Sequence, residues 1–123
     1  MLASGEFEVD LTPQDDSDCP AGRMLINKTY HGDMSGSGTG QMISKRTENG
    51  IAIYFAIEEF SGSVKGNNGS FALVHHGYMS KSSQSLEVTI LEGSGSGELK
   101  DISGSMLITQ DENGHSYELT FEL

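Results

Sequence analysis

The fold is decided by the stretch Ile51-Ala52-Ile53-Tyr54-Phe55-Ala56-Ile57-Glu58-Glu59-Phe60. Successive side chains of an extended chain point to opposite faces, so the run 51–57 is apolar on both sides. A turn signal, Glu48-Asn49-Gly50, comes directly before it. We therefore predict a strand here, and we expect both of its faces to be covered.

The segments on either side of this strand are also typical of short strands. They lie at 5–11, 24–31, 34–45, 70–76, 86–91, 106–109 and 115–123. No segment shows a sustained helical period. About eight strands with hairpin-like connections favour an all-β fold, an antiparallel barrel of about eight strands that removes exposed sheet edges. A β-sandwich is the alternative. A chain of 123 residues fits one domain, residues 1–123.

Glycines punctuate these strands in a repeated pattern. The form apolar-x-Gly-x-apolar-x-Gly occurs at 30–36 and again at 60–66, and we interpret both copies as strand corners. The alternate glycines of 36–40 and 93–97 are followed by no predicted helix, whereas a dinucleotide-binding loop needs a helix N-terminus. We therefore interpret these glycines as structural. A bare stripe of alternate glycines permits the close approach of another chain segment.

The charge balance argues against two classes of partner. The formal net charge is −11, with 18 acidic and 7 basic residues. Such a surface repels phosphate backbones and anionic lipid headgroups, so we expect neither nucleic acid nor membrane as a partner. The first ten residues lack the basic and continuously apolar segments of a signal peptide. A cytoplasmic location is the resulting expectation.

Cysteine and histidine indicate no metal or redox chemistry. Cys19 is the only cysteine, so no internal disulfide is possible; it lies in an acidic loop, where we expect it to be exposed and of ordinary reactivity. The histidines show no short-range ligand pair, and adjacent His75 and His76 would point to opposite faces of a strand. We expect no metal and no cofactor.

The candidate site consists of polar residues set into apolar strands. Glu58 shares a strand face with Tyr54, and the alanines at 52 and 56 on that face leave space. His75 lies on the next strand, which antiparallel pairing brings alongside. We predict that Tyr54, Glu58 and His75 line one end of the barrel interior as ligand-binding residues, with His115 and Tyr117 nearby.

The alternative interpretation of the same residues is structural. Glu58 and His75 would then belong to a satisfied buried network, or Glu58 would be a solvated charge at a strand end. A buried Glu58 without a full set of partners would favour its neutral form. In that case a Glu58→Gln substitution would leave the fold intact or even stabilise it.

Several motifs resemble those of a known family. They are the run 58–77, the segment 93–99 with Ile102-Ser103-Gly104, and the closing His115-Ser116-Tyr117. Over about residues 5–123 the sequence resembles the bacterial family called domain of unknown function 3224. Asp101 departs from the pattern, where a glycine is expected. The resemblance implies a barrel similar to that of plant allene oxide cyclase and places Glu58, His75 and His115 at motif positions, but the family has no established activity.

These observations favour a barrel that binds a small hydrophobic or amphipathic molecule in its interior. One alternative is a structural or interaction module with a filled barrel, and another is an isomerase or cyclase that uses Glu58 and His75. The size and polarity of the lumen distinguish them. Because a monomer covers only the inner face of 51–57, we also expect a homo-oligomer, with a dimer as the first expectation.

Overall fold

The computed structural model describes residues 1–15 and 18–123, and those residues form nine β-strands and no helix. The strands are β1 (Leu2–Pro13), β2 (Gly22–Gly32), β3 (Met34–Arg46), β4 (Ala52–Val64), β5 (Asn67–Met79), β6 (Gln84–Ile90), β7 (Ser96–Gly97), β8 (Ser103–Asp111) and β9 (Gly114–Glu122). No helix long and apolar enough to cross a membrane occurs in the described part of the chain.

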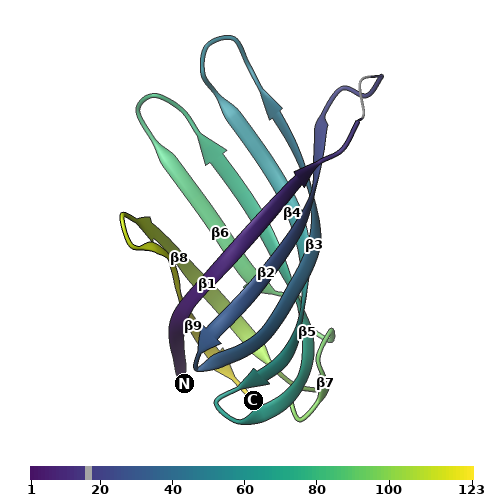
Figure 1. Ribbon diagram of the computed structural model, residues 1–123, viewed down its shortest axis with the longest axis vertical. Coiled ribbons are helices and arrows are strands. Elements are labelled where there is room, and N and C mark those ends of the chain that lie inside the picture. Colours follow the sequence, from purple (N-terminus) through teal and green to yellow (C-terminus); the bar gives the residue numbers. More distant parts are fainter. Residues whose placement is uncertain (16–17) are drawn as a thin grey trace.

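Eight of these strands close into an antiparallel barrel, which confirms the predicted fold. The sheet order is β4-β3-β2-β1-β9-β8-β6-β5, and the pairing of β4 with β5 joins its two ends (Figure 1). The ninth strand, β7, lies at the end of the segment 93–97, whose alternate glycines we interpreted as structural. It adds only the pairs Ser70–Ser96 and Gly69–Gly97 to one end of β5. Closure leaves no edge strand of the main sheet unpaired.

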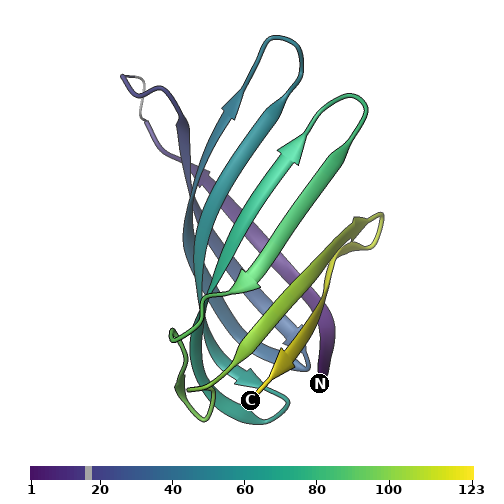
Figure 2. The same cartoon turned by 180° about the vertical axis from the view of Figure 1, so that it is seen from behind.

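The two ends of the barrel differ. Both chain termini and β7 lie at one end, which we call the closed end (Figure 1). At the opposite, open end, the β3–β4 and β5–β6 hairpins extend well beyond the β8–β9 hairpin (Figure 2). The buried apolar side chains gather toward the closed end and include Tyr30, Met34, Phe60, Phe71, Tyr117 and Phe121.

The segment between β6 and β8 completes the closed end. Leu99 and Ile102 are fully or almost fully buried, at 0% and 1% exposure. Two backbone hydrogen bonds, from Leu99 N to Ser96 O and from Ile102 N to Leu99 O, fold the segment into successive turns. A short connection thereby inserts two apolar side chains into the core, where the strands alone would leave a gap.

The repeated glycine pattern has two structural roles. Gly32 and Gly66 have positive φ angles of 100° and 85° and lie at the turns that follow β2 and β4, as the corner interpretation predicts. Gly36 and Gly62 instead lie within strands and face one another across the β3–β4 ladder. A Cβ atom on Gly36 would lie 2.2 Å from Ser61 O, so the two backbones approach too closely for any side chain.

No segment of the described residues covers the outer face of β4. Phe55 and Ile57 are 46% and 63% exposed, and Ile43 on β3 is 50% exposed beside Phe55. Phe55 stacks on the His76 ring, with 4.8 Å between ring centroids. The expectation that both faces are covered therefore holds only for the inner face. Covering of the outer face by a second subunit stays a prediction.

Candidate functional site

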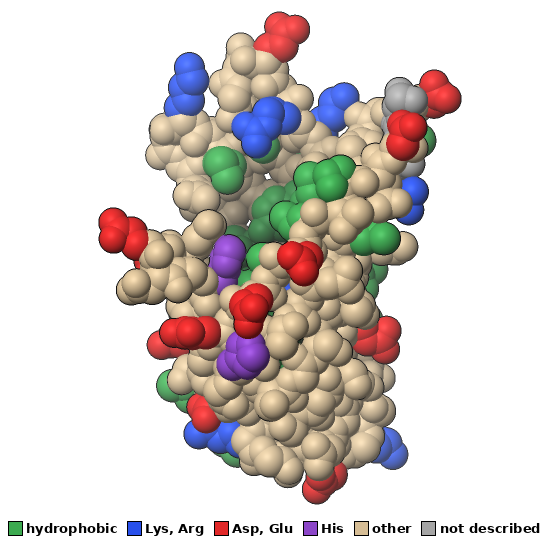
Figure 3. All heavy atoms as spheres, viewed as in Figure 1, with side chains coloured by type: hydrophobic (Ala, Val, Ile, Leu, Met, Phe, Trp, Pro, Cys, Tyr) green, Lys and Arg blue, Asp and Glu red, His purple; other side chains and the backbone are tan. Residues whose placement is uncertain are grey.

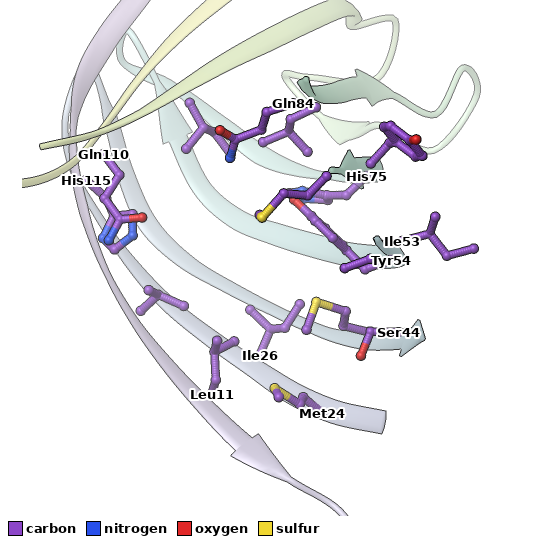
Figure 4. Close-up of a pocket in the computed structure, with 18 of the residues that line it drawn as sticks. Leu11, Met24, Ile26, Ser44, Ile53, Tyr54, His75, Gln84, Gln110 and His115 are labelled. Carbon is purple, nitrogen blue, oxygen red and sulfur yellow. The ribbon is translucent and has the colours of Figure 1, made fainter. Parts of the chain in front are cut away.

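The open half of the barrel contains a cavity of about 910 Å³. Figure 3 shows the hollow between the strands, with hydrophobic side chains inside it. Apolar side chains from seven strands form most of its wall, and they include Met42, Leu86 and Ile108. Figure 4 shows three more of them, Leu11, Met24 and Ile26. The barrel interior is thus packed with side chains at the closed end and hollow at the open end.

Small residues on β4 and β5 help to make this space. Ala52 and Ala56 line the cavity on the inner face of β4. Gly77 pairs with Tyr54 across the β4–β5 ladder, and a Cβ atom on Gly77 would lie 2.1 Å from the Tyr54 ring. The ring therefore rests against the bare backbone of β5. Tyr54 can lie along the cavity wall because its neighbour has no side chain.

A buried ion pair lies at the floor of the cavity, where the hollow half meets the packed half; Lys28 lines the cavity and Glu58 lies below it. Glu58 on β4 is 0% exposed, and its Oε1 atom accepts a hydrogen bond from Lys28 Nζ on β2 at 2.9 Å. His75 Nε2 on β5 lies 2.9 Å from the same oxygen, and the Tyr30 hydroxyl donates to Oε2. The carboxylate has a donor on each oxygen, as a buried charge requires.

The glycines of β3 make room for this carboxylate. Gly40 pairs with Glu58 in the β3–β4 ladder. A Cβ atom on Gly38 would lie 2.1 Å from Glu58 Oε2, a distance that no side chain tolerates. The bare stripe noted in the sequence therefore permits the close approach of a buried side chain.

The partners determine the protonation state of Glu58. Burial by itself raises the pKa of this carboxyl. The hydrogen bond from His75 and the charge of Lys28 act in the opposite direction, and together with the Tyr30 hydrogen bond they bring the pKa down to about 2. Burial and the neighbouring carboxylate raise the pKa of the Tyr30 hydroxyl. At neutral pH the carboxylate is ionised and the phenol is neutral.

An aromatic ring connects this network to the opposite wall. Lys28 Nζ lies 4.6 Å from the centre of the Phe7 ring, a cation–π distance, and Lys28 is only 7% exposed. His115 on β9 stacks on the same ring, with 5.0 Å between centroids. Figure 4 shows His115 beside Gln110 on one side of the cavity and His75 with Tyr54 on the other.

The structure brings three of the five predicted site residues to the cavity. Tyr54, His75 and His115 line it, whereas Glu58 lies below it and is not part of its lining. Tyr117 does not line the cavity, because it lies in the packed core near the closed end. Its hydroxyl accepts a hydrogen bond from Met34 N and donates to His31 O, both at 2.8 Å. Two residues further along β9 than His115, it is beyond the floor of the cavity.

Sequence reasoning missed Lys28 and Tyr30. Both lie on the strand face that also carries Met24 and Ile26, so a lysine alternates with apolar residues there. A lysine on an inward apolar face needs a buried acidic partner. This requirement could have linked Lys28 to Glu58, the acidic residue on the inner face of β4.

Metal ligation has no basis in the described residues. Within 1–15 and 18–123, no three His, Cys, Asp or Glu side chains come together in a way that could hold a metal ion. Cys19 is exposed, as predicted, while its reactivity stays a prediction.

The fold and the site define a small closed β-barrel with one packed half, one hollow half and an ion pair between them. The chain belongs to the family described as protein of unknown function (DUF3224), which matches residues 3–122. It is similar to a crystal structure of a protein with unknown function from this family, from Shewanella oneidensis MR-1. The two are 34% identical, with a TM-score of 0.93 over 100% of this chain and 96% of that chain. No curated protein matches the chain.

Proposed function

We propose that the protein binds a small, mainly apolar molecule inside the open half of the barrel. The observation that carries this proposal is the cavity of about 910 Å³ with its predominantly apolar wall. Binding sites for small molecules are typically concave, mostly apolar and about 300–1,000 Å³ in volume. The chain fills the closed half with large side chains but places alanines at 52 and 56 where the cavity lies.

The two alternative functions have less support. A module with a filled barrel has no need of the cavity. An isomerase or cyclase that used Glu58 as a base would need a carboxylate that reaches the substrate and accepts a proton near neutral pH. Glu58 instead lies below the cavity floor with a lowered pKa and three donors around it. The proposal is therefore binding, without a chemical step.

Two expectations accompany this proposal without further support. One is a cytoplasmic location, and the other is the likeness of the barrel to that of allene oxide cyclase. The location adds no chemistry to the site. The likeness of the barrels adds none either, because one fold serves many unrelated functions.

Native mass spectrometry of the protein purified from its own host tests the proposal directly. We expect a co-purifying molecule that is lost after unfolding and refolding in its absence. A second test is titration with the uncharged dye Nile red, which becomes fluorescent in apolar surroundings. The wild type should bind one dye molecule per chain with saturation.

A pair of substitutions on one strand locates the binding. Ala56→Phe places a large ring in the cavity, so it should abolish dye binding. Ile57→Phe is the matched control, because residue 57 is 63% exposed on the outer face of the same strand. Thermal unfolding checks that both variants fold. Equal dye binding by both variants, with no co-purifying molecule, would contradict the proposal.

A further inference from the structure

The charged side chains that line the cavity all have the same sign. They are Lys28 and Arg46, and the protonatable histidines His75 and His115 join them. None of the described Asp and Glu residues belongs to the lining, although the chain has 18 acidic residues and a net charge of −11. Figure 3 shows acidic side chains spread over the outside of the barrel. The cavity thus differs in charge from the surface of the protein.

The basic groups at the floor retain unused hydrogen-bonding capacity. Lys28 Nζ donates to Glu58 alone, which leaves two of its three hydrogens without a partner in the described residues. His75 uses only Nε2. His75 lines the cavity, although it is only 4% exposed. His115 packs against Phe7 through its ring face, which leaves its ring nitrogens available.

Two of these groups lie together at the floor. Lys28 and His75 meet at one oxygen of Glu58, while His115 lies on the other side of the cavity and shares with Lys28 a contact to the Phe7 ring (Figure 4). Glu58 is below the floor, so it has no direct contact with the contents of the cavity. A molecule that reaches the floor therefore meets the Lys28 cation beside His75, and its head must present acceptor oxygens to satisfy them.

We infer that the ligand is an amphipath with a carboxylate head. The head lies against Lys28 at the floor, between the wall that carries His75 and the wall that carries His115, and the apolar tail runs toward the open end. This inference rests on the proposed binding function and specifies its ligand class. An ammonium head would meet like charge at the same place, and an alcohol would satisfy only part of the donor set.

Three probes with one tail and different heads test this inference: decanoate, decanol and decylammonium. Isothermal titration calorimetry on the full chain, below the micelle concentration of each probe, gives the affinities. At pH 6 we expect decanoate to bind about tenfold to a hundredfold more tightly than decanol, since charge-assisted hydrogen bonds have that strength. Decylammonium should bind more weakly than decanol.

Two variants and one control locate the head group. His115→Phe keeps the stack on Phe7 but removes the ring nitrogens, and it should weaken decanoate binding severalfold with little effect on decanol. The pair Lys28→Met with Glu58→Gln removes the cation without leaving a lone charge, and it should abolish the preference for decanoate. Lys100→Met with Glu92→Gln is the control, because it makes the same two changes of charge at exposed positions outside the cavity lining.

The outcomes separate the inference from the proposed function. If decanol binds as tightly as decanoate, or if His115→Phe weakens both probes alike, the carboxylate head is wrong although binding in the cavity stands. If none of the three probes binds, both are wrong. If the double variant does not fold, the His115→Phe comparison still decides whether the head is a carboxylate.

Discussion

Glu58 accepts hydrogen bonds from side chains on two different strands, and this changes what a substitution at that position should do. Lys28 and Tyr30 reach it from β2 and His75 reaches it from β5. The expectation that Glu58→Gln is harmless applies to a carboxyl group with too few partners. In the folded barrel the carboxylate is the counter-charge of an almost buried lysine. The sign of the expected effect is therefore reversed.

We predict that Glu58→Gln lowers the free energy of unfolding by about 3 kcal/mol, because it leaves Lys28 as a buried charge without a partner. Urea unfolding at pH 7 measures the change. Glu59→Gln is the matched control, since residue 59 is the exposed neighbour on the outer face, and it should change stability by less than about 0.5 kcal/mol. Wild-type stability in Glu58→Gln would contradict the burial of the ion pair.

The lowered pKa of Glu58 also predicts a pH dependence. The ordinary pKa is 4.5 and the folded value is about 2, so the unfolded chain takes up a proton at this residue first as the pH falls. The stability that Glu58 contributes is therefore fully present above about pH 5 and is lost between about pH 5 and pH 2. The difference in unfolding free energy between the wild type and Glu58→Gln should shrink over that range. A constant difference would show that the pKa is not lowered.

At the scale of the strand, β3 shows how an element without side chains can position a site. Its glycines at 36, 38 and 40 lie on the inner face and pair with inner-face residues of the neighbouring strand β4. We predict that Gly38→Ala lowers stability by about 1–3 kcal/mol, because the new methyl group would displace the Glu58 carboxylate from its partners. The control is Gly22→Ala, whose Cβ atom would have no neighbour closer than 3.8 Å. Equal effects of the two substitutions would contradict this role of the stripe.

The strands and their inner faces could be predicted from the sequence because a period of two determines which side chains share a face. The depth of a residue within the barrel could not. Tyr117 and His115 share the inner face of β9, yet one lies in the packed core and the other beside the cavity. Depth depends on the stagger between strands, which is a property of the closed barrel and of no single segment. Lys28 was missed for a related reason, since its counter-charge is two strands away.

For the whole molecule, closure of the barrel separates an inner surface from an outer one. The inner surface is packed at the closed end and hollow at the open end, and the sequence does not predict where one gives way to the other. That boundary depends on whether facing residues from several strands are large, as Tyr30 and Phe60 are, or small, as Ala56 is. The outer surface carries most of the acidic residues, and it also carries the exposed apolar strip on β3 and β4 formed by Ile43, Phe55 and Ile57.

This strip leads to the prediction of a homodimer. Residues on the outer face of a monomeric barrel have no core of their own to pack against, and contiguous exposed apolar patches usually mark an interface. A second copy is the partner that we expect, because matching strips related by a two-fold axis would bury one another. Light scattering at micromolar concentration should give twice the chain mass of 13.2 kDa. Ile57→Asp should give the monomer mass and leave the cavity unchanged. Leu107→Asp, at a 66% exposed position on β8, should remain a dimer, and a wild type of 13.2 kDa would contradict the prediction.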